Sequence, residues 1–156
     1  MRKEIILGLI KKYPGTTFNE ILHETNLSNG VISHYLMKLL DNDEIQKEGE
    51  KRGKYFIKNI PKKDRMLIMI LRNRTNNNII KFLMDNSNDQ NIFSTKDIAK
   101  HIKKSGSTIS ISLKTLQKNK MIERVITHKN VKLTNDLGYK IYRRVLLASF
   151  IVKYNL

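Results

Sequence analysis

The chain has 156 residues, and its 30 Lys and Arg against 14 Asp and Glu give a formal net charge of +16. It contains no Cys, which excludes a disulfide framework, a thiolate metal site and a cysteine nucleophile. Its hydrophobic fraction of 40% can fill a core, but no apolar run approaches the roughly 18 residues of a membrane span, and the N-terminus does not resemble a signal peptide. We therefore expect a basic, globular, cytoplasmic protein whose first candidate partner is a polyanion, most often nucleic acid.

The first part of the chain predicts three helices followed by a hairpin. The apolar residues at helical spacing are Ile5, Ile6, Leu9 and Ile10 in the first helix, Phe18, Ile21 and Leu22 in the second, and Ile32, Leu36 and Leu39 in the third. Thr17 with Glu20 forms a capping-box pattern at the start of the second helix. Two β-prone runs, Ile45–Glu48 and Lys54–Lys58, flank a polar turn bounded by glycines, which predicts a β-hairpin.

The same order of elements recurs farther along the chain at a constant shift of 77 residues. This shift superposes Thr17 on Ser94 and Glu20 on Asp97, which supplies a second capping-box pattern. It also superposes the third helix and its flanks on matching residue types, which are Ser105, Ile109, Ser110, Leu113, Leu116 and Ile122. So regular a correspondence at structural positions indicates an internal duplication of one supersecondary unit.

Between the two copies, residues 61–75 form a basic linker that contains the apolar run Met66–Leu71. The run is apolar on every side, so a short buried helix or a docking segment fits it better than a flexible linker does. The three residues Asn76-Asn77-Asn78 are expected to begin the first helix of the second copy. The runs Arg124–Thr127 and Val131–Thr134 predict a second hairpin.

The two third helices, Ser28–Leu39 and Ser105–Leu116, resemble the recognition helix of the winged helix-turn-helix family, with its small polar start and its T-V-S-x-x-L-x-x-L pattern. The segment Leu133–Gly138 resembles the L-T-x-x-G step that follows the wing in such regulators, and the double arrangement is similar to archaeal regulators with two such domains. The resemblance implies a mainly α fold with small β-hairpins, built from two tandem winged helix-turn-helix domains plus a C-terminal helix. The segments would be a first domain 1–60, a linker 61–75, a second domain 76–134 and a C-terminal helix 135–156.

The third helix of the second copy has the character of a DNA-reading helix. A helix fits the major groove of B-DNA, about 12 Å wide, when one stripe packs on the protein and the opposite stripe is small, polar or cationic. On a helical wheel, the stripe opposite Ile109, Leu113 and Leu116 meets this condition. The candidate DNA-binding residues of this copy are Lys103, Lys104, Ser105, Ser107, Thr108, Ser110, Ile111, Lys114 and Lys118, with His128, Lys129 and Lys132 in the wing.

The first copy carries a weaker signal. Its equivalent stripe is Gly30, His34, Met37 and Asp41, which includes no cation. Its candidate DNA-binding residues are Asn29, Ser33, His34 and Lys38 on the helix, and Lys51, Arg52 and Lys54 in the wing. Residues 1–60 hold 10 basic and 8 acidic residues, a net of +2, whereas residues 61–156 hold 20 and 6, a net of +14. We therefore expect the second copy to be the main DNA-binding domain, and the first either to bind DNA or to dock a protein.

Other chemistries are weakly indicated. A Lys-rich composition can follow from AT-rich codons, but such a bias does not explain why the charge lies in one half. The four His have no carboxylate or Cys at ligand spacing, and the Ser-rich run 105–112 lacks a base with an orienting acid. We expect no metal site, no cofactor and no enzymatic activity.

The predicted closing helix, from about Asn135 to Tyr154 with Thr134 as its N-cap, is apolar on more than one side. Its run Val145–Val152 is hydrophobic almost all round, which indicates that two sides of the helix are covered. One side can cover its own domain and the other a second copy of the chain, in a homodimer suited to a two-fold operator. Alternatively, Met66–Leu71 fills the second side within one chain.

These patterns predict a sequence-specific DNA-binding transcriptional regulator that is cytoplasmic and nucleoid-associated. Its partners would be double-stranded DNA and a second copy of the chain; no membrane contact is expected, and no small-molecule effector is identified. Two alternatives stay open. One is a non-specific architectural, nucleoid-type DNA-binding protein. The other is a tandem winged-helix protein-interaction subunit of a replication, transcription or chromosome complex.

Overall fold

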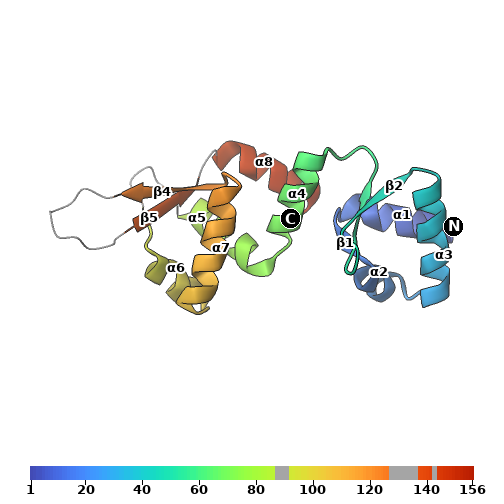
Figure 1. The fold of residues 1–156 in the computed structure, drawn as a ribbon, viewed down its shortest axis with the longest axis horizontal. Coiled ribbons are helices and arrows are strands. Elements are labelled where there is room, and N and C mark those ends of the chain that lie inside the picture. Colours follow the sequence, from blue (N-terminus) through green and yellow to red (C-terminus); the bar gives the residue numbers. More distant parts are fainter. Residues whose placement is uncertain (87–91, 127–136, 142–143) are drawn as a thin grey trace. The chain divides into compact units, whose positions relative to one another are not determined.

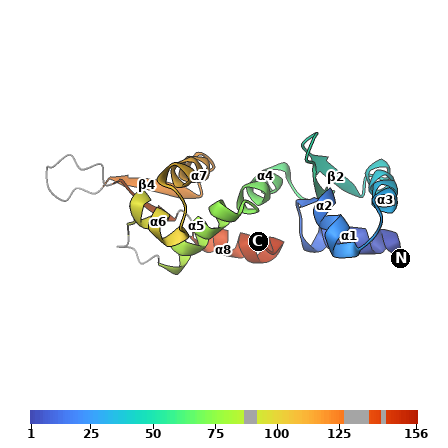
Figure 2. The same cartoon turned by 90° about the horizontal axis from the view of Figure 1, so that it is seen from below.

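The chain divides into two compact units, each with its own core. A computed structural model describes residues 1–86, 92–126, 137–141 and 144–156. Unit 1 comprises Met1–Met69 with Val152–Leu156, and unit 2 comprises Ile70–Ile151. Helices predominate in both units, and each unit has a small antiparallel sheet (Figure 1, Figure 2). In the described parts of the chain, no helix is long and apolar enough to cross a membrane.

Unit 1 combines helices with a three-stranded sheet. Its elements are α1 (Arg2–Lys12), β1 (Thr16–Thr17), α2 (Phe18–Thr25), α3 (Asn29–Asp41), β2 (Ile45–Glu48), β3 (Lys54–Ile57) and most of α4 (Lys62–Leu71). The strand β3 lies between β1 and β2 and pairs antiparallel with both, with Thr16 opposite Tyr55 and Ile45 opposite Ile57. The first predicted hairpin is therefore confirmed, and a helical unit with this small sheet is consistent with a winged helix fold.

The core of unit 1 forms where its first three helices pack on the sheet. The buried residues of this cluster are Ile6, Ile10, Ile21, Ile32, Leu36, Leu39, Ile45 and Tyr55. The stripe predicted for α3 is confirmed, because Ile32 and Leu39 are fully buried while Met37 on the same helix is 64% exposed. The helix is thus fixed along one face and open along the other.

The described residues of unit 2 form three helices, a two-stranded antiparallel sheet and a further helix. Its elements are α5 (Arg74–Asp85), α6 (Thr95–Ile102), α7 (Gly106–Lys118), β4 (Ile122–Ile126), β5 (Leu137–Ile141) and α8 (Arg144–Tyr154), whose last residues belong to unit 1. The two strands pair antiparallel, with Ile122 opposite Ile141. The fully or almost fully buried apolar residues include Ile79, Ile80, Leu83, Ile98, Ile109, Leu113 and Leu116.

Both predicted capping boxes are confirmed. The Thr17 hydroxyl accepts a hydrogen bond from the Glu20 backbone N–H, and the Ser94 hydroxyl accepts one from the Asp97 N–H. In return, each acidic side chain accepts a hydrogen bond from the backbone N–H of its cap residue, at 2.7 Å for Glu20 and 3.0 Å for Asp97. Donors that the first turn of a helix cannot satisfy internally are thus satisfied at the start of α2 and of α6.

Backbone turns also recur at the shift of 77 residues. The residues after α2 and α6, Asn26 and Lys103, both adopt the left-handed conformation, with φ of 53° and 58°. The helices α3 and α7 that follow each have 13 residues. After each of them comes another left-handed residue, Asp43 with φ of 59° or Lys120 with φ of 57°. The helices α3 and α7 are therefore each preceded and followed by a left-handed residue at equivalent positions.

The closing helix is shorter than predicted. Leu137–Ile141, expected within that helix, instead forms β5, and α8 begins at Arg144. Gly138 disfavours a helix, whereas Tyr139 and Ile141 are residue types that favour strands. The prediction that the closing helix already includes residues 137–141 was therefore wrong.

The second hairpin differs from its prediction in the same region. Its first strand is Ile122–Ile126 rather than Arg124–Thr127, and the second described strand is β5. The run Val131–Thr134, which was predicted to be that strand, lies outside the described residues together with the proposed N-cap Thr134 and Asn135.

Two further predictions are refined. The helix expected within residues 61–75 is confirmed as α4, but it is buried on one side only, because Ile68 and Leu71 are fully buried and Met66 is 52% exposed. The next helix begins at Arg74 rather than Asn76. The cause is an N-cap that was not predicted: the Asn73 side chain accepts a hydrogen bond from the Asn76 N–H at 3.1 Å.

The C-terminal residues are tied to unit 1. The Tyr154 hydroxyl donates to Asp64 Oδ2 of α4 at 2.6 Å, and Asn155 Nδ2 donates to the Lys12 carbonyl at the end of α1 at 2.9 Å. Tyr154 is itself buried, with 6% of its surface exposed. The chain end therefore contributes to the packing of unit 1 although it follows unit 2 in the sequence.

Removing the cap of α6 should destabilise unit 2. We expect Ser94→Ala to lower the free energy of unfolding by about 1 kcal/mol, because the Asp97 N–H loses its acceptor. Denaturant unfolding followed by circular dichroism measures this change. Thr95→Ala, at the first helical position, is the matched control; an equal loss in both variants would contradict the capping role.

The same cap should be visible in a pH titration. Hydrogen bonds from the Ser94 side chain, and then from its backbone N–H, hold the pKa of Asp97 below its ordinary value. Because this folded-state pKa is lowered, the stabilisation is present above the unfolded pKa and is lost as the pH falls through the folded one. In Ser94→Ala, NMR titration should show the pKa of Asp97 closer to its ordinary value.

Candidate nucleic-acid interface

The turn before α7 presents two cations. The backbone N–H groups of Lys103 and Lys104 both donate to the Ala99 carbonyl, Lys104 at 3.3 Å, so they complete the end of α6. Both side chains are exposed. Since the turn itself uses only their backbone groups, the two ammonium groups are held immediately before the N-terminus of α7.

Three hydroxyl groups cluster at the start of α7. The N-cap Ser105 accepts from the Thr108 N–H at 3.3 Å, and its Oγ lies 3.0 Å from Ser107 Oγ and 2.8 Å from Thr108 Oγ1. All three residues are exposed. A Cβ added to Gly106, the first helical residue, would meet nothing within 4 Å, so the protein's own packing does not require this glycine. The helix therefore begins with small, polar groups and open space, which allows a close approach by a phosphate or a base edge.

The body of α7 has one buried face and one cationic face. Ile109, Leu113 and Leu116 are at most 1% exposed. On the opposite face, Lys114 and Lys118 are exposed, and Ile111 on the same face is 68% exposed. Ser110, at the edge of this face, is half-buried. The buried and exposed faces of α7 thus agree with the helical wheel drawn from the sequence.

The corresponding helix of unit 1 exposes a different set of groups. Asn29, Ser33, His34 and Lys38 are all exposed on α3. The His34 ring packs edge-on against Tyr35, with 5.2 Å between the ring centroids. The N-cap Ser28 forms no side-chain capping hydrogen bond, unlike Ser105. One lysine, an apolar Met37 and a neutral start give this helix little attraction for phosphate.

The two wings are described to different extents. In unit 1, Lys51 and Arg52 are exposed in the turn between β2 and β3, and Lys54 at the start of β3 is half-buried. In unit 2, the predicted wing residues His128, Lys129 and Lys132 lie outside the described residues.

Two basic residues near the end of α7 were not predicted from the sequence. Lys120 and Arg124 line a hollow of about 320 Å³ together with Gln117, Ile122 and Glu123. The available signal was the shift of 77 residues, because Lys120 occupies the left-handed position that Asp43 holds in unit 1. Unit 2 thus has a lysine where unit 1 has an aspartate, and its basic surface continues past the end of α7.

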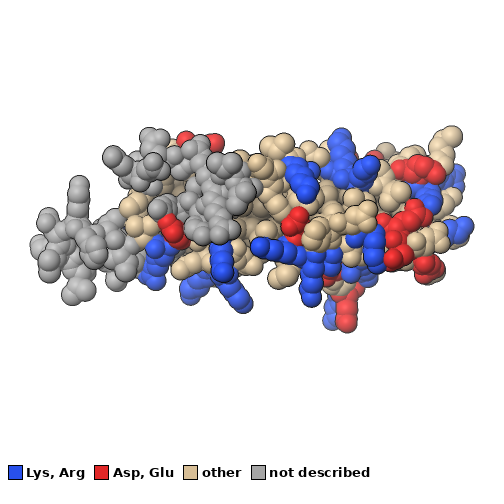
Figure 3. Space-filling model, turned by 90° about the horizontal axis from the view of Figure 1, so that it is seen from above, with Lys and Arg blue, Asp and Glu red and all other residues tan. Residues whose placement is uncertain are grey.

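The charge of the chain is divided unevenly between the units. Unit 1 holds 14 Lys and Arg against 9 Asp and Glu, whereas unit 2 holds 16 against 5. On the face shown in Figure 3, the acidic side chains gather mainly on unit 1. In the parts that the structure describes, no group of three or more His, Asp or Glu is placed to hold a metal ion.

Comparisons with known proteins give only distant likenesses. No family model matches the chain, and no curated protein matches it. Two solved structures of MepR variants from S. aureus are 15% and 14% identical, with TM-scores of 0.47 and 0.46; each covers 83% of this chain, and 78% and 77% of their own. The DIP2311 protein from Corynebacterium diphtheriae is 14% identical over 90% of this chain and 26% of its own, with a TM-score of 0.31.

Proposed function

We propose that the protein is a sequence-specific DNA-binding transcriptional regulator and that unit 2 is its main DNA-binding part. The observation that carries the proposal is the face of α7 that exposes Lys114, Lys118 and Ile111 opposite a fully buried stripe. Lysine side chains can meet phosphates or guanine, and an exposed apolar side chain can touch a thymine methyl. A helix with this division of faces can lie in a major groove without exposing its own core.

The organisation that goes with this proposal is a pair of winged helix-turn-helix domains. Its support is the recurrence of caps and left-handed turns at one constant shift. The first domain spans residues 1–60 and the second begins at about residue 76, with α4 between them and a C-terminal helix after them. The protein acts in the cytoplasm on double-stranded DNA, without catalysis and without a cofactor or metal.

We also propose that the active form is a homodimer that uses the C-terminal helix. Val152 on α8 is 78% exposed, which is unusual for an apolar residue on a helix this hydrophobic. A two-fold protein suits a palindromic operator, whose half-sites are read by two copies of the same helix.

Salt dependence tests DNA binding by the full chain. Four cations near α7, Lys103, Lys104, Lys114 and Lys118, are expected to meet phosphate, so log K should fall with log salt with a slope of about −3 to −4. Fluorescence anisotropy of a labelled duplex between about 0.05 and 0.2 M salt measures this slope. A chain without DNA affinity even at low salt would contradict the proposal and favour a protein-interaction subunit of a replication, transcription or chromosome complex.

Selection of bound sequences from a random duplex library tests specificity. A regulator should enrich a defined motif, palindromic if it acts as a dimer. Binding without any enriched motif would favour the architectural, nucleoid-type alternative. The surface of unit 1 also fits a protein-interaction role, because the exposed face of α3 includes Met37 and carries only Lys38 as a cation.

A further inference from the structure

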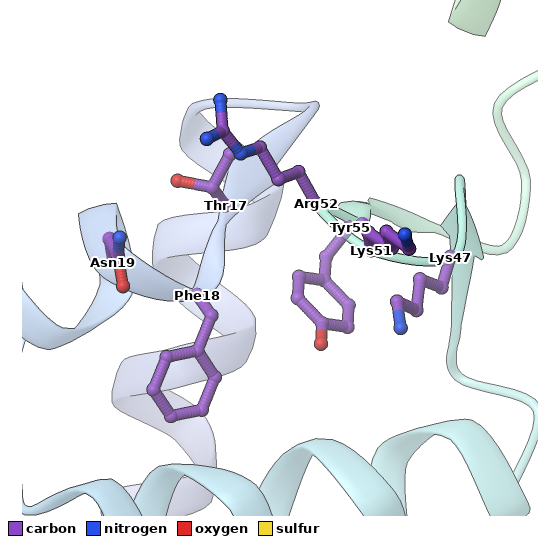
Figure 4. Close-up of a pocket in the computed structure, with 8 residues that line it drawn as sticks. Thr17, Phe18, Asn19, Lys47, Lys51, Arg52 and Tyr55 are labelled. Carbon is purple, nitrogen blue, oxygen red and sulfur yellow. The ribbon is translucent and has the colours of Figure 1, made fainter.

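Unit 1 contains a cavity of about 360 Å³ between the β2–β3 turn and the start of α2. Three of its lining side chains are cationic, namely Lys47, Lys51 and Arg52, and two are aromatic, Phe18 and Tyr55. In Figure 4, the side chain of Arg52 reaches toward Thr17, and the rings of Phe18 and Tyr55 come from different elements. None of the residues that line this described cavity is acidic.

Two of these cations have no partner among the described residues. Among the residues that the structure describes, the side chains of Lys51 and Arg52 form no hydrogen bond and no ion pair. Lys47 donates to the Glu50 carbonyl at 3.3 Å and thus uses one of its three donors. The guanidinium and ammonium donors at the cavity are therefore available to an anion.

Two nearby carboxylates are engaged elsewhere, and a third, Glu50 of the β2–β3 turn, does not line the cavity. Glu20 closes the capping box at Thr17, where it accepts from the backbone N–H at 2.7 Å and from the hydroxyl at 2.9 Å. Glu48 is paired with Arg65 at 2.7 Å. Because these acids already have their own donors, they do not neutralise the cationic side of the cavity.

The position of Lys47 depends on Gly53. A Cβ built on Gly53 would lie 1.9 Å from Lys47 Cε and 2.8 Å from its Cδ and Cγ, so the Lys47 stem occupies the space that the glycine leaves. Both residues line the cavity. The missing side chain of Gly53 thus helps to keep the Lys47 ammonium beside the cavity.

The cavity has a cationic side and an aromatic side, and together they indicate the class of ligand. Tyr55 is 8% exposed and Phe18 is half-buried, so their rings offer an apolar surface with fixed orientation. Small-molecule sites combine such walls with a few polar groups in volumes of roughly 300–1,000 Å³. A bare phosphate would use only the cations, whereas a phosphate ester with a flat ring would use both sides.

We propose that unit 1 binds a small phosphate monoester with a flat ring, its phosphate against Arg52, Lys51 and Lys47 and its ring against Phe18 and Tyr55. Charged hydrogen bonds to phosphate fix one end of the ligand and ring contacts fix the other. The two rings beside the cations favour a free small molecule over a backbone phosphate of a DNA duplex, although both supply the same anion. This site goes beyond the proposed DNA binding and does not depend on α7.

Titration of the full chain with AMP as the probe tests the site, by isothermal calorimetry and by NMR shifts of Phe18 and Tyr55. We expect saturable binding of one AMP per chain, with shifts at both rings. Inorganic phosphate should bind at least about tenfold more weakly, because it lacks the ring contacts, and adenosine should be similarly weakened, because it lacks the phosphate. No saturable AMP binding, or equal binding of AMP and phosphate, would overturn the proposal.

Two variants locate the site. The double variant Lys51→Ala/Arg52→Ala should weaken AMP binding by at least about tenfold, whereas Lys11→Ala, an exposed lysine on α1 that does not line the cavity, should leave it unchanged. Gly53→Ala should weaken it severalfold, because the added methyl displaces the flexible end of Lys47. Circular dichroism establishes that each variant is folded, and AMP binding that is unchanged in the folded double variant would place AMP elsewhere.

A further titration with DNA distinguishes a free phosphate ester from the phosphates of a DNA backbone. A short duplex added to the AMP complex should leave the Phe18 and Tyr55 shifts in place, since DNA is expected at α7. If the duplex alone reproduced those shifts and AMP did not, the anion at this cavity would be nucleic acid and the small-molecule proposal would be wrong. Failure of DNA binding at α7, measured with Lys114→Ala/Lys118→Ala, would leave the AMP result unaffected.

Discussion

The double variant Lys114→Ala/Lys118→Ala should bind a DNA duplex on the order of 10- to 100-fold more weakly than the parent chain at about 0.1 M salt. Each lysine that meets a phosphate releases a counterion, so losing both should also make the slope of log K against log salt less steep by about 1.8. Both side chains are exposed on the face of α7 opposite its buried stripe, so the substitutions remove charge without opening the core. Fluorescence anisotropy at several salt concentrations measures both quantities.

The matched control removes the same number of cations from unit 1. Lys38→Ala/Arg52→Ala takes away one lysine from α3 and one arginine from the β2–β3 turn, both exposed. We expect a change of less than about threefold, because α3 has no second cation on its exposed face to act with Lys38. Equal losses in the two double variants would show that both units contribute alike, and the division of roles proposed here would then be wrong.

Replacing Ile32 by Ala should lower the free energy of unfolding of unit 1 by about 2–5 kcal/mol. Ile32 is fully buried in the cluster that α1, α2, α3 and β2 form, so the change removes apolar contacts and leaves a cavity behind. A loss of this size is a large part of the stability of a small domain. Urea unfolding, followed by the fluorescence of the tyrosines or by circular dichroism, measures it.

Met37 on the same helix provides the control. It is 64% exposed, so Met37→Ala should change stability by less than about 0.5 kcal/mol. The contrast tests the orientation of α3, because a helix rotated about its axis would exchange the burial of the two residues. A large loss for Met37→Ala with a small one for Ile32→Ala would contradict the fold described for unit 1.

Features set by short-range chemistry could be predicted from the sequence. The capping boxes at Thr17 and Ser94 depend on an acid three residues after a hydroxyl, and both form as expected. The buried stripes of α3 and α7 follow from the spacing of Ile and Leu alone. The hairpin of unit 1 follows from two β-prone runs around a glycine-bounded turn, and only its last residue differs.

Features set by pairing over longer distances could not. The strand β1 has two residues, and it is defined by its pairing with Tyr55 and Lys54 of β3, far along the chain. The segment Leu137–Ile141 contains enough apolar residues to fit the end of a hairpin or the start of a helix, and its partner β4 decides between them. The cavity beside Lys47 and Phe18 was also beyond the sequence, because its walls come from separate elements that only the fold brings together.

The left-handed residues around α3 and α7 have a consequence for how the surface of this protein can vary. Asn26 and Lys103, like Asp43 and Lys120, share a backbone conformation but not a charge. The bends that orient each helix are thus compatible with neutral, acidic and basic side chains, so the geometry of the turn does not constrain its electrostatics. A chain built in this way can acquire or lose affinity for a polyanion by single substitutions at these bends while the helix between them keeps its direction.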